Sequence, residues 1–153
     1  TKTRQERHDW TLHNLELVHM THAQDRKPDE ISGGMKKRAG LARAMALDPD
    51  ILFFDEPSSG LDPVVSAEID ELILDIKAAM NVAIVVVTHD MESAFKIADR
   101  ITVMGEGRVL MTGTVDEVRG SDDERIQDML NRRPRDERID PDAYLGRLTG
   151  TRP

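Results

Sequence analysis

The sequence predicts an α/β fold built on a parallel sheet. Residues 51–54 and residues 82–87 are continuous apolar runs, which are typical of strands buried on both faces of such a sheet. Between them, residues 63–80 place apolar side chains at helical spacing, which predicts a helix. Pro63 would be its first residue, and proline is well tolerated at the start of a helix. Polar residues follow each strand, and open α/β sheets bind ligands at the carboxyl ends of their strands.

The composition narrows the class of protein. The chain has 153 residues, 39% of them hydrophobic and 33% charged, which suits one ordinary domain with a core. No apolar run approaches the roughly 20 residues that span a bilayer, and the polar stretch 1–7 does not resemble a signal peptide. The chain has no cysteine, which fits a reducing cytoplasm. A net charge of −8 argues against nonspecific nucleic-acid binding, which requires a basic face.

Two acids, Asp55 and Glu56, come directly after the first strand, and Pro57 ends it. On an extended backbone their side chains point to opposite sides. One carboxylate can then hold Mg²⁺, usually through water, while the other orients and deprotonates an attacking water. On this segment alone, two solvated acids at the end of a core strand are an equally good interpretation.

Ser32 precedes a helix that we expect to run to about residue 47. Its hydroxyl can cap the exposed amides, and Gly33 and Gly34 allow a ligand close to the backbone. Because a helix amino terminus favours anions, residues 32–35 form a candidate phosphate clamp. A simple glycine-rich helix start is the alternative.

The remaining segments are expected to form the following structures. Residues 2–19 are expected to be helical, and the histidines at positions 8–22 are more typical of a solvated face than of a metal site. His89 follows the second strand as Glu56 follows the first, so both face one crevice. Residues 101–111 predict a hairpin, and residues 114–117 predict a capping box for a short helix.

Four segments occur in a characteristic order: Ile-Ser-Gly-Gly-Met at 31–35, Ile-Leu-Phe-Phe-Asp-Glu-Pro at 51–57, Ser-Ser-Gly-Leu-Asp at 58–62 and Val-Val-Val-Thr-His-Asp at 85–90. Together they resemble the signature motif, Walker B strand, D-loop and switch histidine of the ATP-binding subunits of ABC transporters. The resemblance covers roughly residues 1–118. The signature motif of this family usually ends in glutamine. The matching residue here is Met35, which cannot form the same hydrogen bonds.

The resemblance implies a role for each matching residue, with ATP and Mg²⁺ as cofactors. Asp55 would hold Mg²⁺ through water, Glu56 would be the catalytic base, and His89 would support the γ-phosphate. The residues expected to bind the nucleotide held by the opposite subunit are Ser32, Gly33, Gly34, Met35 and, in the D-loop at the dimer seam, Asp62.

The resemblance also divides the chain. Residues 1–40 would be part of the helical subdomain, 41–118 the carboxyl-terminal part of a RecA-like P-loop NTPase core, and 119–153 a charged extension. No segment matches the P-loop, the Q-loop glutamine or the adenine-stacking aromatic, which the family places before its signature motif. We therefore expect residue 1 to lie inside a longer polypeptide, and the chain alone not to bind ATP tightly.

The implied protein is the ATPase subunit of a transporter, a homodimer at the cytoplasmic face of the cell membrane beside a permease. The Gly-Gly-Met variant resembles Mla-type phospholipid-trafficking ATPases, which would add a periplasmic lipid-binding partner. An importer of another solute remains an alternative. A soluble ABC-type ATPase is another alternative. Translation factors of this type, however, usually carry Thr-Asn-His-Leu-Asp where this chain has Ser-Ser-Gly-Leu-Asp at 58–62. Chromosome-maintenance ATPases carry long heptad-repeat coiled coils, and this sequence shows none. A noncatalytic subunit is the last alternative.

Overall fold

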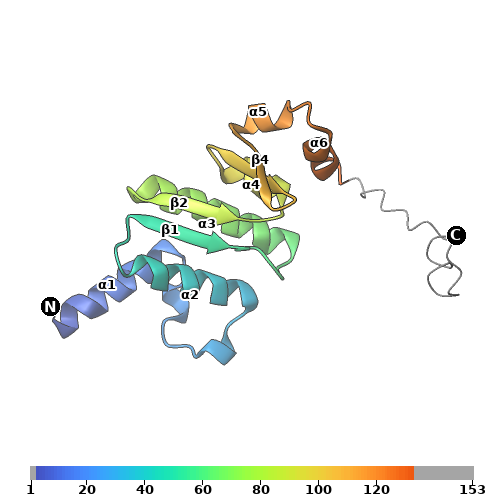
Figure 1. The fold of residues 1–153 in the computed structure, drawn as a ribbon. Coiled ribbons are helices and arrows are strands. Elements are labelled where there is room, and N and C mark those ends of the chain that lie inside the picture. The colour runs from blue at the N-terminus through green and yellow to red at the C-terminus, as the bar shows by residue number, and fades with distance from the viewer. Residues whose placement is uncertain (1–2, 133–153) are drawn as a thin grey trace, which may run out of the picture. The chain divides into compact units, whose positions relative to one another are not determined.

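The computed structural model describes residues 3–132 of the chain. It divides into two compact units, Thr1–Asp99 and Arg100–Pro153 (Figure 1). Within the described part, no helix is long and apolar enough to cross a membrane. The predicted charged extension, residues 119–153, lies outside the described residues from position 133 onward.

The first unit alternates helices with two strands. Its elements are α1 (Arg4–Leu17), the 3₁₀ helices η1 (Thr21–Ala23) and η2 (Pro28–Glu30), α2 (Gly33–Met45), β1 (Ile51–Asp55), α3 (Pro63–Ala79), β2 (Ala83–Val87) and α4 (Met91–Ile97). Strands β1 and β2 are parallel and α3 connects them (Figure 1). The α/β fold with a parallel sheet is therefore confirmed.

The core of this unit lies on one face of the sheet. Leu52 and Phe54 of β1 are buried there. They belong to one apolar cluster with residues of the surrounding helices and of the segment after α1, namely Val18, Met20, Ala23, Leu41, Ala42, Met45, Ile69, Leu72, Ile73, Ile76 and Ile97. The carboxyl ends of β1 and β2 project from this core together, because Asp55 is paired with Val87 in the parallel register.

The prediction that both strands are buried on both faces is wrong. Phe53 is 73% exposed, and its register partner Val85 is 43% exposed. Ile51 and Val87 are exposed on the same face, since residues two apart in a strand share a face. In this chain, helices therefore cover one face of the sheet formed by β1 and β2, and its other, apolar face is open.

The second unit contains a hairpin and two short helices. Its elements are β3 (Ile101–Gly105), β4 (Arg108–Gly113), α5 (Val115–Arg119) and α6 (Glu124–Leu130). Strands β3 and β4 are antiparallel, and Glu106 and Gly107 turn the chain with φ of 53° and 73°, as a two-residue primed turn requires. The predicted capping box is present. The Thr114 hydroxyl accepts a hydrogen bond from the backbone N–H of Glu117, and the Glu117 carboxylate accepts one from the backbone N–H of Thr114.

Candidate functional site

The structure brings Glu56 and His89 into contact at the carboxyl ends of β1 and β2. Oε1 of Glu56 lies 2.8 Å from Nδ1 of His89 and accepts a second hydrogen bond, at 3.1 Å, from the His89 backbone N–H. An ionised carboxylate only accepts, so Nδ1 carries the proton in this pair. Both contacts use the same oxygen, and Oε2 of Glu56 makes no hydrogen bond to any of residues 3–132.

Glu56 has a left-handed backbone, with φ of 47°. The expectation that Asp55 and Glu56 continue one extended strand, with their side chains on opposite sides, is therefore corrected at Glu56. The Glu56 N–H still donates to the Val87 carbonyl at 2.8 Å, so the chain leaves the sheet one residue beyond β1. Non-glycine residues rarely occupy this region, and such outliers cluster at functional sites.

The electrostatics of the pair favour a protonated imidazole. The hydrogen bond to Glu56 raises the pKa of His89 above its ordinary value, and the negative charge of Glu56 raises it further. The His89 side chain is 83% exposed and that of Glu56 32% exposed. The pair is therefore open to a ligand that approaches from solvent.

Asp55 lies at the end of β1, on the open face of the sheet with Phe53. A carboxylate oxygen is a donor that Mg²⁺ accepts, and Mg²⁺ usually keeps several waters and takes few protein ligands. A single exposed carboxylate at a strand end fits such an ion held through water. No three histidine, aspartate or glutamate side chains within residues 3–132 group into a site that could hold a metal by themselves.

Ser32 is the N-cap of α2, as the sequence predicts. Its hydroxyl oxygen accepts a hydrogen bond from the backbone N–H of Met35 at 3.2 Å. The helix ends at Met45, two residues before the expected end. Because the hydroxyl accepts this bond, its own hydrogen is left to donate to an anion.

The two signature glycines differ in what surrounds them. A Cβ at Gly34 would lie 2.7 Å from Cγ1 of Val65 on α3, whereas one at Gly33 would meet Leu61 at an ordinary 3.6 Å. Gly34 therefore lets α2 and α3 pack closely. This packing role was not foreseen from the sequence, because it depends on a contact between two helices.

Asp62 is the N-cap of α3. One of its carboxylate oxygens accepts hydrogen bonds from the backbone N–H groups of Val64, at 3.0 Å, and Val65, at 3.1 Å. The residue predicted to lie at a dimer seam thus also starts the helix that carries Val65. This cap holds the end of the loop formed by residues 58–62.

A buried polar pair supports the helix that follows His89. Asp70 on α3 accepts a hydrogen bond from the hydroxyl of Ser93 on α4, and both residues are buried. Asp90, next to His89, caps the same helix through the N–H groups of Glu92 and Ser93. The role of Asp70 was not foreseen, because an acid within a helix gives no local signal of a buried partner.

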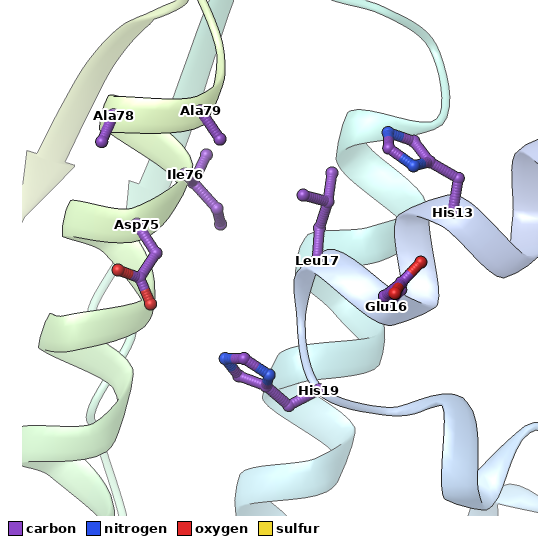
Figure 2. Close-up of a pocket in the computed structure, with 8 residues that line it drawn as sticks. All are labelled: His13, Glu16, Leu17, His19, Asp75, Ile76, Ala78 and Ala79. Carbon is purple, nitrogen blue, oxygen red and sulfur yellow. The ribbon is translucent and has the colours of Figure 1, made fainter.

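The pocket shown in Figure 2 lies between α1 and α3 and has a volume of about 560 Å³. Its lining consists of His13, Glu16, Leu17, His19, Asp75, Ile76, Ala78 and Ala79. None of the predicted site residues contributes to it. The predicted site therefore lies at the strand ends and not in this pocket.

Comparison with known proteins shows which proteins this chain is similar to. Residues 2–59 match the family model of the ABC transporter. The nitrate transport protein NasD of Klebsiella oxytoca is 42% identical over 110 residues, covering 72% of this chain and 42% of that protein. The probable ribonucleotide transport ATP-binding protein mkl of Mycobacterium leprae is 40% identical over 132 residues, covering 86% of this chain and 38% of that protein.

A solved structure shares the fold. The structure of cbiO1 from Clostridium perfringens, part of the ABC transporter complex cbiONQ, matches with a TM-score of 0.74 and 27% identity. The match covers 98% of this chain and 56% of that one. The chain spans less than half the length of the two curated relatives. From the family match, the relatives and the shared fold we conclude that this chain is similar to part of an ABC transporter ATP-binding domain.

Proposed function

We propose that this chain belongs to the ATP-hydrolysing subunit of an ABC transporter and that Glu56 is its general base. The observation that carries the proposal is the Glu56–His89 contact at the ends of two parallel strands. His89 occupies one carboxylate oxygen of Glu56 and leaves Oε2 for a water molecule. A base needs this combination of fixed orientation and one open oxygen.

His89 has two functions in this proposal. Its Nδ1–H and its backbone N–H hold the Glu56 carboxylate. Its Nε2 belongs to a side chain that is 83% exposed, so it can approach the terminal phosphoryl group of a nucleotide bound at the strand ends. Catalysis of phosphoryl transfer rests mainly on positioning and electrostatic stabilisation, and this pair can supply both.

Asp55 is proposed to hold Mg²⁺ through water at the same edge. When bound, the ion would neutralise charge on the phosphate oxygens. Asp55 contributes an exposed carboxylate directly beside the base, on the sheet face that the helices leave open. The carboxylate therefore places a negative charge where a hydrated cation is required.

Residues 32–35 and Asp62 are proposed to complete the nucleotide site of a second subunit. The free hydroxyl hydrogen of Ser32 and the first N–H groups of α2, from Gly33 and Gly34, are donors suited to a phosphate. Met35 contributes its backbone N–H to the Ser32 cap, which orients that hydroxyl. Asp62 holds the D-loop at the start of α3.

Replacing Glu56 with glutamine in the full-length subunit tests the proposal. The amide keeps the shape but cannot take a proton, so we expect turnover of ATP to fall roughly 100- to 10,000-fold, with ATP affinity nearly unchanged. The steady-state rate of phosphate release and a nucleotide titration measure the two effects. Glu16→Gln, at an exposed acid of α1, is the matched control and should keep the wild-type rate. Undiminished turnover in Glu56→Gln would show that another group is the base.

We infer phospholipid as the cargo from the Gly-Gly-Met form of the signature motif. In this proposal the subunit acts at the cytoplasmic face of the membrane, with a permease and a periplasmic lipid-binding protein. The relatives are named for nitrate and ribonucleotide transport, and the glycine betaine transport ATP-binding protein OpuAA of Bacillus subtilis is 40% identical over 115 residues. Import of a small solute is therefore the alternative. Mass spectrometry of the purified subunit–permease complex should detect bound phospholipid, and a bound small solute without lipid would favour the alternative.

A further inference from the structure

Lys37, on the second turn of α2, reaches the segment after β1. Its Nζ donates a hydrogen bond of 3.1 Å to the backbone carbonyl of Glu56, in a partly buried setting. Lys36, its neighbour, is exposed. The helix that begins at Ser32 is thus tied to the backbone of the residue proposed as the base.

This contact falls on a conformation that needs support. Glu56 has a φ of 47°, and a non-glycine residue in the left-handed region costs on the order of 1–3 kcal/mol and persists only where its surroundings hold it. The Glu56 carbonyl accepts from the Ser59 N–H at 3.1 Å as well as from Lys37, and its N–H donates to Val87 at 2.8 Å. Three partners therefore fix this single peptide segment.

The ammonium of Lys37 differs from the two backbone partners in being charged. Hydrogen bonds with an ionised donor are roughly twice as strong as neutral ones. These contacts fix the backbone at Glu56, and the Glu56 side chain is attached to the Cα of that backbone. The direction of its carboxylate therefore depends on the backbone that Lys37 binds.

We propose that Lys37 is a positioning residue for hydrolysis, which orients the Glu56 carboxylate by holding the Glu56 carbonyl. The inference rests on the proposed function of Glu56. Lys37 acts through the backbone of the base and does not bind the nucleotide. Its loss should therefore lower the rate of the chemical step and leave ATP affinity almost unaltered.

Variants of the full-length subunit test this proposal. Lys37→Met keeps the length of the side chain and removes the donor, so we expect kcat to fall roughly 10- to 100-fold, as a misplacement near 1 Å can cause, with KM for ATP within about twofold. Lys37→Arg restores a charged donor and should recover most of the rate. Lys36→Met is the matched control on the exposed position and should behave as wild type.

A double-variant cycle separates positioning from a general structural role. In the Glu56→Gln background there is no base to orient, so Lys37→Met should cause no further loss of kcat. A full additional loss in that background, or a KM that rises by the same factor as kcat falls, would overturn the proposal in favour of a structural role or a direct contact with phosphate. If Lys37→Met does not fold, Lys37→Leu, which also has no donor, replaces it, with the same expected loss of kcat.

The outcomes distinguish this inference from the function on which it rests. Wild-type protein without ATPase activity, or full activity in Glu56→Gln, would contradict the proposed function. Normal kcat in Lys37→Met together with loss of turnover in Glu56→Gln would overturn the role of Lys37 alone.

Discussion

The backbone of Glu56 is held by hydrogen bonds, and so is one of its two carboxylate oxygens. Its N–H and carbonyl have three partners, and one carboxylate oxygen is held by His89. The remaining oxygen is the reactive one in the proposed mechanism. This division explains how an acid that is 32% exposed can keep a defined direction at the end of a strand.

The contact also couples the charge of His89 to Glu56. Because the Glu56 carboxylate raises the pKa of His89 above the usual value of about 6.5, the protonated imidazole persists to higher pH than in an isolated histidine. The stabilisation from the pair is complete below about pH 6.5 and is lost as pH rises through the raised pKa. Glu56→Gln removes the carboxylate, so we expect the His89 pKa to fall.

NMR titration of the His89 ring protons in the full-length subunit measures this shift. The Glu16→Gln variant provides the control and should retain the wild-type titration of His89. An unchanged His89 midpoint in Glu56→Gln would mean that the contact does not persist in solution.

Helices α2 and α3 meet where the signature motif begins. Gly34 allows the approach, since a Cβ there would lie 2.7 Å from the Val65 side chain. Val65 also donates its N–H to the Asp62 cap, so displacing it disturbs the first turn of α3. The spacing of the two helices thus depends on a residue without a side chain.

Substitution at two glycines of α2 tests this explanation. Gly34→Ala should destabilise the subunit by about 1–3 kcal/mol, the usual cost of overpacking, and lower its Tm. A Cβ at Gly40 would meet nothing within 4 Å, so Gly40→Ala should raise Tm, because alanine is the better helix former by about 1 kcal/mol. Thermal denaturation of both variants gives the comparison, and equal shifts in one direction would contradict it.

At the scale of the whole chain, the sheet of the first unit carries an open apolar face. Ile51, Phe53, Val85 and Val87 are all exposed there, with Phe53 at 73%. Exposed apolar faces and unpaired strand edges favour association. The 153-residue chain by itself should therefore form oligomers as its concentration rises.

A charge on that face should suppress this association. We expect Phe53→Asp to shift the chain toward monomer, whereas Val64→Asp, at a position of α3 that is 70% exposed, should leave association unchanged. Sedimentation equilibrium over a range of concentrations measures both. A wild-type chain that stays monomeric throughout would show that the face is not adhesive.

The local features of this protein were determined by its sequence. The α/β class, the cap at Ser32 and the turn at Glu106 and Gly107 each depend on neighbours a few residues apart, so periodicity and capping chemistry predict them. The pairing of Glu56 with His89 was also accessible, because carboxyl ends of parallel strands share an edge.

Only the tertiary structure decided which sheet face is covered, that Gly34 meets Val65, and that Lys37 holds the Glu56 carbonyl. An apolar strand has the same pattern whether one face or both are covered, because its sequence does not record how many layers pack on it. Contacts between elements depend on how helices and strands are placed in space. Side-chain type and local spacing do not specify that placement.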